Sequence, residues 1–140
     1  MAYQAFSDQW AAAYKDEINK SDAYRQAGKG WKWKVGLVVE AEPDKNWPES
    51  KGLLMDLFEG EARDVKVTSA DEARGADYVI TASYSRWKEV ATEKLDATRG
   101  MLQGKLKLKG DLPTIVRYTN ASQELTKATT RVPVEWPDER

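Results

Sequence analysis

The residues best suited to chemistry in this chain are three lysines at alternate positions and a few carboxylates that lie side by side. Lys105, Lys107 and Lys109 could hold an anionic head group, or they could keep the edge of a sheet from pairing with another chain. Adjacent carboxylates such as Asp71 and Glu72 suit metal binding or acid–base chemistry, but in polar stretches they are usually only solvated. We therefore expect solvated surface at the carboxylates and leave both interpretations of the lysines open.

The other residue types exclude several kinds of active site. With neither histidine nor cysteine, the chain lacks the commonest general base, the commonest metal ligand and the thiolate nucleophile. Gly28-Lys29-Gly30 lacks the third glycine of a dinucleotide-binding fingerprint and precedes a predicted strand, where that fingerprint needs a helix. We expect no catalytic residue, no metal and no cofactor, and hence a protein that is not an enzyme.

The charge and hydropathy of the chain argue against two classes of partner. Its 22 basic and 23 acidic residues give a formal net charge of -1, without the basic excess of a nucleic-acid-binding protein. No apolar run approaches the ~20 residues that span a bilayer, and residues 1–6 do not resemble a signal peptide. We expect a cytoplasmic protein with no stable membrane insertion. Residues 1–131 are expected to form one domain, and residues 132–140 an extended C-terminal tail.

Hydrophobic periodicity predicts an α+β protein. The predicted strands span residues 31–41, 51–59, 63–68, 78–82 and 105–109. The predicted helices span residues 7–20, 21–27 and 112–130, and two shorter helices begin after caps at Ser85 and Asp96. Residues 70–75 are predicted to be a polar connection. The short links between successive strands indicate an antiparallel sheet.

The second predicted strand has large apolar side chains on both faces. Leu53, Met55 and Leu57 share one face, while Leu54 and Phe58 lie on the other. The second face is therefore either covered by another part of the chain or exposed as a patch through which two copies pair. The second alternative predicts a homodimer through Leu54 and Phe58.

Two predicted helices carry contrasting apolar faces. Phe6, Trp10, Tyr14 and Ile18 recur every four residues, a spacing that favours core packing over direct contact with a ligand. The last helix has a thin inner face of small, branched and hydroxylated side chains, namely Ile115, Val116, Thr119, Ser122, Leu125 and Ala128. Because such a face buries little area, we expect this helix to open locally as a lid.

The number of large side chains leaves two arrangements of the core open. Six Trp, six Tyr, two Phe and three Met fall mainly on faces of the sheet and helices that must meet. They either fill a solid core or are held apart by a curved sheet and the last helix, where they enclose a cavity for a small molecule.

Three stretches resemble the sterol carrier protein 2 (SCP-2) domain family in its bacterial and archaeal single-domain form. They are Gln-Gly-Lys-Leu-Lys-Leu-Lys-Gly-Asp at residues 103–111, ahead of an amphipathic helix, and residues 76–82 and 85–90. The resemblance implies an α+β fold in which a five-stranded, mainly antiparallel sheet carries helices on one face around an apolar tunnel. It also implies binding and transport of fatty acids, acyl-CoA, sterols or phospholipids.

From this resemblance we expect a non-enzymatic carrier that holds an apolar ligand in a tunnel between the sheet and the C-terminal helix. The residues expected to line the tunnel are Trp33, Leu37, Met55, Ile80, Trp87, Met101, Leu106, Ile115, Val116 and Thr119. The alternative is a self-associating interaction module that recruits apolar substrate for a partner enzyme.

Overall fold

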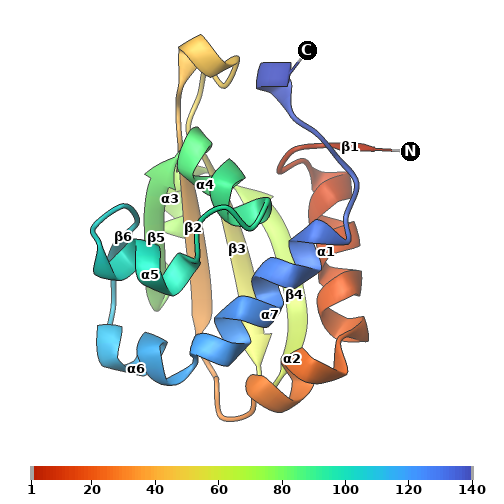
Figure 1. Ribbon diagram of the computed structural model, residues 1–140, viewed down its shortest axis with the longest axis vertical. Helices are drawn as coiled ribbons and strands as arrows, with labels where there is room; N and C mark the ends of the chain where they lie inside the picture. The colour runs from red at the N-terminus through yellow and green to blue at the C-terminus, as the bar shows by residue number, and fades with distance from the viewer. Residues whose placement is uncertain (1, 140) are drawn as a thin grey trace.

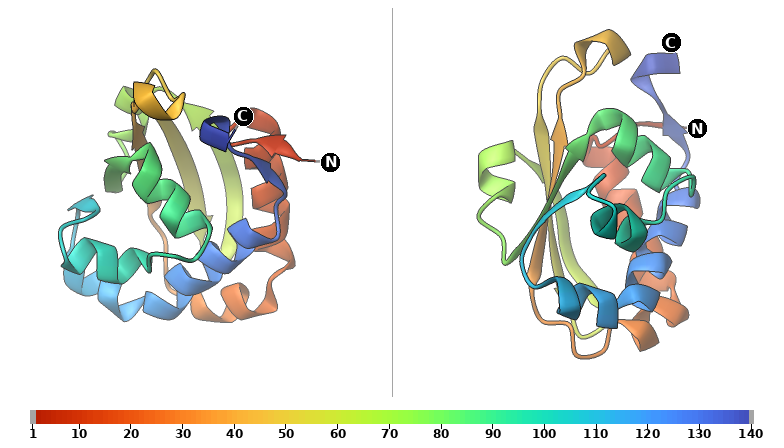
Figure 2. Two further views of the ribbon diagram at one scale, coloured as in Figure 1. Left: turned by 45° about the horizontal axis from the view of Figure 1, so that its top comes forward. Right: turned by 60° about the vertical axis from the view of Figure 1, so that its left-hand side comes forward.

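Five strands form one mixed sheet, and most of the helices pack against a single face of it (Figure 1, Figure 2). The computed structural model describes residues 2–139, and residues 1 and 140 lie outside the described part. In spatial order the strands are β4 (Glu61–Thr68), β3 (Lys51–Phe58), β2 (Lys34–Glu40), β5 (Tyr78–Ser83) and β6 (Lys107–Lys109). The predicted α+β fold class with a five-stranded, mainly antiparallel sheet is confirmed.

The sheet is antiparallel except at one junction. β2, β3 and β4 form consecutive hairpins, and β6 pairs antiparallel with β5. β5 instead runs parallel to β2, because the chain leaves β4, crosses the outer face of the sheet and enters β5 from the other end. β6 forms one edge of the sheet, where Lys107 and Lys109 are exposed.

Alternation along the strands places a row of apolar side chains on the inner face. Val35 pairs with Met55, and Leu37 pairs with Leu53, across the β2–β3 ladder. Ile80 lies beside Leu37 on β5. Leu53 and Met55 are each only 2% exposed, so this row forms the floor on which the helices rest.

Six helices lie over the inner face, and the right-hand view of Figure 2 shows them on one side of the sheet. They are α1 (Asp8–Lys20), α2 (Asp22–Ala27), α4 (Tyr84–Ala91), α5 (Ala97–Leu102), α6 (Leu112–Arg117) and α7 (Thr119–Thr130). Ser7, Ser21 and Asp96 cap α1, α2 and α5, since each side chain accepts a backbone N–H from three residues further on. Among residues 2–139, no helix combines the length and the apolar character needed to cross a membrane.

A short helix, α3 (Ala70–Ala73), lies on the outer face, where the sequence predicted only a polar connection (Figure 2). Gly36 and Gly52 leave room for it in the sheet. A Cβ added at Gly36 would lie 2.0 Å from the carbonyl oxygen of Ala73, so no larger residue fits there without movement of α3. The outer face of β2 and β3 is therefore partly covered by this helix.

Two helix boundaries differ from the predicted ones. α4 begins after Ser83, whose hydroxyl accepts a backbone N–H of the first turn, and not after Ser85. Ser85 instead donates its backbone N–H and its hydroxyl to the carboxylate of Glu42. The long helix predicted over residues 112–130 is divided at Tyr118 into α6 and α7.

The segment after α7 packs against the N-terminal end of the chain (Figure 1). Its strand β7 (Val134–Glu135) pairs in parallel with β1 (Tyr3–Gln4), and a 3-10 turn follows at Pro137–Glu139. Between them, the rings of Trp136 and Phe6 meet edge to face, with 5.8 Å between centroids. The described part of the predicted tail is thus a strand and a turn held by side-chain and backbone contacts.

Candidate ligand-binding site

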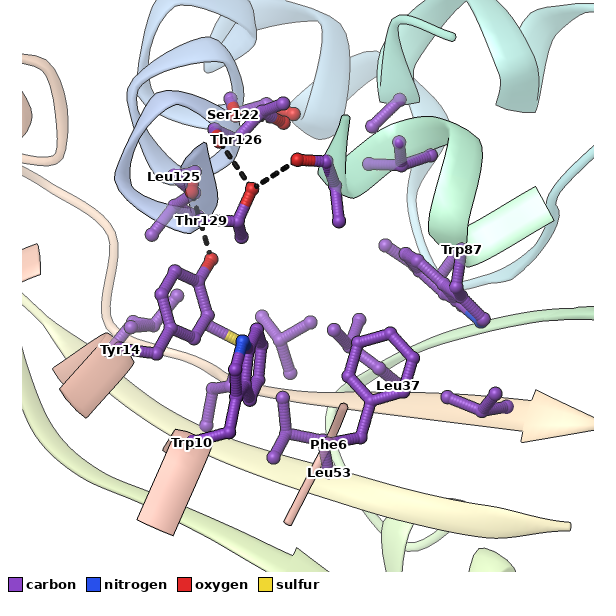
Figure 3. A pocket seen from close by; sticks show the side chains of 18 residues that line it. Phe6, Trp10, Tyr14, Leu37, Leu53, Trp87, Ser122, Leu125, Thr126 and Thr129 are labelled. Atoms are coloured by element: carbon purple, nitrogen blue, oxygen red, sulfur yellow. Dashed lines mark hydrogen bonds between the residues drawn. The ribbon is translucent and has the colours of Figure 1, made fainter. Parts of the chain in front are cut away.

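An apolar cavity of about 100 Å³ lies between the inner face of the sheet and helices α1, α4 and α7 (Figure 3). Strands β2, β3 and β5 supply its floor, and the helices supply its walls and roof. The lining side chains are aliphatic, aromatic or hydroxyl-bearing, apart from the thioether of Met55. They belong to Phe6, Trp10, Tyr14, Val35, Leu37, Val39, Leu53, Met55, Leu57, Ile80, Trp87, Val90, Ala91, Ala97, Ser122, Leu125, Thr126 and Thr129.

A second apolar cavity, of about 70 Å³, lies further along α7 towards α5 and α6. Its lining includes Tyr24, Trp31, Met101, Ile115, Tyr118 and Ala121. The two cavities share five lining residues, namely Val35, Leu57, Ile80, Ser122 and Leu125. They are therefore neighbours beneath α7 and share part of their walls.

Six of the ten residues predicted to line a tunnel contact one of these cavities. Leu37, Met55, Ile80 and Trp87 line the first, while Met101 and Ile115 line the second, which Ile80 also contacts. They come from β2, β3, β5, α4, α5 and α6, so the fold brings together residues that are widely separated in the sequence.

The other four predicted residues line neither cavity. Leu106 is buried in the core, while Trp33 is 36% exposed and packs against other aromatic rings. Val116 is 44% exposed, and the half-exposed Thr119 donates its hydroxyl to the Val116 carbonyl. Val116 and Thr119 flank the break at Tyr118 and are turned away from both cavities, whereas Ser122 and Leu125 of the same predicted face line them.

Three lining residues come from the aromatic stripe at the start of the chain, for which the sequence favoured core packing. Phe6, Trp10 and Tyr14 are buried in the core, and they also form the cavity wall beside α1. Their spacing identified the buried face of the helix, but helical spacing alone does not show whether a buried face meets atoms or empty space. α7 contributes Thr126 and Thr129, which the sequence analysis did not single out.

The polar groups around the first cavity are uncharged. Tyr14 donates its hydroxyl to the carbonyl of Leu125 at 3.0 Å, and burial, with a smaller effect of nearby Tyr24, raises the pKa of Tyr14. Thr129 places its hydroxyl 3.0 Å from the carbonyl of Ala91. Within the described residues, no Asp, Glu, Lys or Arg lines either cavity, and no group of three or more acidic residues is placed to hold a metal ion. This arrangement suits binding of apolar groups.

The lysines that could have held an anionic head group lie elsewhere. Lys105, Lys107 and Lys109 are exposed at or beside the edge strand β6, and none of them lines either cavity. Their position at an open edge favours the interpretation that they discourage pairing with another sheet.

Comparison with known proteins gives one family and several similar structures. Residues 14–123 match the SCP-2 sterol transfer family. A crystal structure of a sterol carrier protein 2 is 32% identical with a TM-score of 0.85, covering 92% of this chain and 99% of that one. A hypothetical protein of Thermus thermophilus, described as a candidate sterol carrier, is 31% identical with a TM-score of 0.85, covering 96% of this chain and 94% of that one.

A more distant structure shares the fold. Sterol carrier protein 2 of Aedes aegypti, solved in complex with the C16 fatty acid palmitate, is 15% identical with a TM-score of 0.55. The alignment covers 87% of this chain and 98% of the mosquito protein. None of the curated proteins matches the chain.

Proposed function

The chain belongs to the SCP-2 sterol transfer family, and on that premise we propose that it binds and carries a long apolar ligand without catalysing a reaction on it. The ligand classes are a fatty acid, acyl-CoA, a sterol or a phospholipid, and we expect the carriage to be cytoplasmic. The observation that carries this proposal is the uncharged cavity between the sheet and α7. The palmitate complex of the mosquito protein supports it by analogy of fold.

We further propose that the two cavities merge into one tunnel when a ligand enters. The first cavity measures about 100 Å³ and the second about 70 Å³, whereas small-molecule sites usually hold about 300–1,000 Å³. α7 is the element best suited to move, because its fully buried residues are only Ala121 and Ala128. A helix held by such small side chains gains little burial and opens at low cost.

Direct titration tests the carrier function. Fatty acids, acyl-CoA and a fluorescent sterol are added to protein that has been unfolded, stripped of lipid and refolded, and binding is followed by tryptophan fluorescence. At least one class should bind with a Kd below ~100 μM, equivalent to about 5.5 kcal/mol. Absence of binding by every class to the refolded protein, with its native circular dichroism restored, would remove the carrier function.

A second candidate function, a self-associating module that recruits substrate for a partner enzyme, rests on the outer face of the sheet. Phe58 is 36% exposed there, and Leu54 is half-buried. The guanidinium of Arg63 lies over the Phe58 ring, 4.3 Å from its centroid. Such a patch suits a second copy of the chain.

This second function predicts that the wild-type protein sediments as a dimer at micromolar concentration and that Phe58→Glu sediments as a monomer. The charge would have to be buried without a partner in the dimer, which is strongly unfavourable. Lys94→Glu, an exposed charge change in the loop after α4, serves as the control and should leave the dimer intact. A monomer for all three proteins, with ligand binding unchanged, excludes this function.

A further inference from the structure

One residue in the wall of the first cavity has a buried side-chain hydrogen-bond donor without an acceptor. Among the described residues, the buried side-chain polar atoms without a partner are Trp10 Nε1, Trp47 Nε1 and Thr98 Oγ1. Of these residues only Trp10, which is 2% exposed, lines the apolar cavity. Folded proteins satisfy nearly all of their buried hydrogen-bond donors. An unsatisfied donor in the wall of a ligand cavity is therefore a candidate partner for an acceptor atom of the ligand.

The neighbouring side chain on α1 complements this donor. Tyr14 lies one helical turn after Trp10, and the two rings are 4.9 Å apart between centroids and tilted by 33°. Figure 3 shows the nitrogen-bearing edge of Trp10 turned towards Tyr14, among the lining side chains. Since the Tyr14 hydroxyl gives its proton to the Leu125 carbonyl, its oxygen retains lone pairs that can accept a hydrogen bond. Trp10 and Tyr14 therefore bring an unused donor and an oxygen with free lone pairs to the same wall of the cavity.

The charge of the cavity restricts which polar group can occupy this place. Within the described residues, the lining contains no cation that could pair with an ionised carboxylate. Burial of an unpaired carboxylate is strongly unfavourable, so the head group of an ionised fatty acid would have to remain outside. An uncharged oxygen meets the requirement of the Trp10 N–H without that penalty.

We propose that Trp10 selects and orients the ligand by donating a hydrogen bond from Nε1 to a hydroxyl, ketone or ester oxygen at the buried end of an uncharged long-chain molecule. This inference rests on the proposed carrier function and specifies its ligand class. A buried water is the competing acceptor, since the cavity is large enough to hold one and a water needs two or more polar partners.

A matched pair of ligands tests the role of Trp10. Methyl undecyl ketone and tridecane have the same chain length and differ by one oxygen, and each displaces a dansyl-labelled long-chain probe from the site. The ratio of ketone affinity to alkane affinity should be at least about fivefold higher in the wild-type protein than in Trp10→Phe, the effect of one net hydrogen bond. Trp10→Phe keeps an aromatic ring but loses the N–H, so the ketone oxygen would be buried there without a donor.

Trp87→Phe is the control variant. Trp87 lines the same cavity, but its Nε1 already donates to the carbonyl of Val38 at 2.9 Å. The ratio of ketone affinity to alkane affinity should therefore keep its wild-type value in Trp87→Phe, even if the affinity for both ligands changes. Because each preference is a ratio measured within one variant, differences in stability between the variants cancel.

A second measurement needs no variant. In protein labelled with ¹⁵N-tryptophan, the ketone should move the indole proton of Trp10 downfield, and tridecane should not. The same ratio of ketone affinity to alkane affinity in the wild-type protein and in Trp10→Phe would overturn the inference while the carrier function stands. Failure of the probe and of both ligands to bind would overturn the inference, and the carrier function would fall with it only if fatty acids, acyl-CoA and the sterol also failed to bind in the direct titration.

Discussion

Ser122→Leu is expected to weaken the binding of a long-chain ligand at least tenfold while it stabilises the unliganded protein. Ser122 lines both cavities, so a leucine side chain there fills space that the ligand needs. Each buried methylene of a ligand contributes about 0.8 kcal/mol, and loss of two or three of them lowers the affinity roughly tenfold to fiftyfold. The added apolar burial should raise the free energy of unfolding by about 1 kcal/mol and Tm by about 3 °C.

Gln123→Leu is the matched control, because it makes a similar change at the next residue of α7, where the side chain is exposed. A ligand titration and a thermal melt on both variants should show the two effects only for Ser122→Leu. Wild-type affinity in Ser122→Leu would mean that the ligand does not occupy the space beneath α7. Lower stability with binding intact would show that this part of α7 is packed core and does not act as a lid.

Much of the fold could be predicted because its signals are local. In a strand such as β3 (Lys51–Phe58), the alternation of apolar side chains predicts which face is buried. In a helix such as α1, the capping residue Ser7 predicts where the helix begins. α3 has a capping serine, Ser69, but its single turn is too short to show an apolar stripe. It is accommodated because Gly36 and Gly52, distant in sequence, let it approach the sheet.

The candidate site was harder to predict, for a geometric reason. The floor residues Leu37 and Met55 follow from strand alternation, and the structure places both beside the first cavity. For the roof, the predicted inner face of the last helix correctly included Ser122 and Leu125, but it also included Thr119, which lines neither cavity, and it missed Thr126. The break at Tyr118 had no signal in the periodic pattern. Whether facing side chains touch or leave a cavity depends on distances between elements, which a sequence pattern does not contain.

The C-terminal turn is fixed to α4 by a largely buried ion pair. Asp138 accepts hydrogen bonds from Lys88 at 3.0 Å and from the hydroxyl of Tyr84 at 2.6 Å, and its side chain is 19% exposed. The same turn follows Trp136, whose ring packs on Phe6 in the cavity wall. Loss of the Asp138 charge should therefore loosen the turn that supports one side of the candidate site.

Asp138→Asn is expected to lower the free energy of unfolding by about 1–2 kcal/mol near neutral pH, because hydrogen bonds to a charged group are among the stronger ones. Asp44→Asn, a change at an exposed carboxylate in the turn Pro43–Lys45, is the control and should have little effect. Urea unfolding of the three proteins measures the difference. Equal stability of Asp138→Asn and the wild-type protein would mean that the turn is held by Trp136 and the β1–β7 pairing alone.

The pH dependence gives this prediction a definite sign. Burial by itself would raise the pKa of Asp138, but hydrogen bonds from Tyr84 and Lys88, together with the Lys88 charge, outweigh it and lower the pKa below its usual value. The stability that Asp138 contributes is therefore present above its unfolded pKa, about 4, and is lost as the pH falls through the lower folded value. Burial by itself would lower the pKa of Lys88, but hydrogen bonds to Glu139 and Asp138 outweigh it and raise that pKa. The stability that Lys88 contributes is therefore lost only as the pH rises through the raised pKa. The gap in stability between wild-type protein and Asp138→Asn should thus stay constant near neutral pH and close below about pH 4. A gap that persists unchanged in acid would show that the asparagine disturbs packing and that the charge of Asp138 contributes nothing.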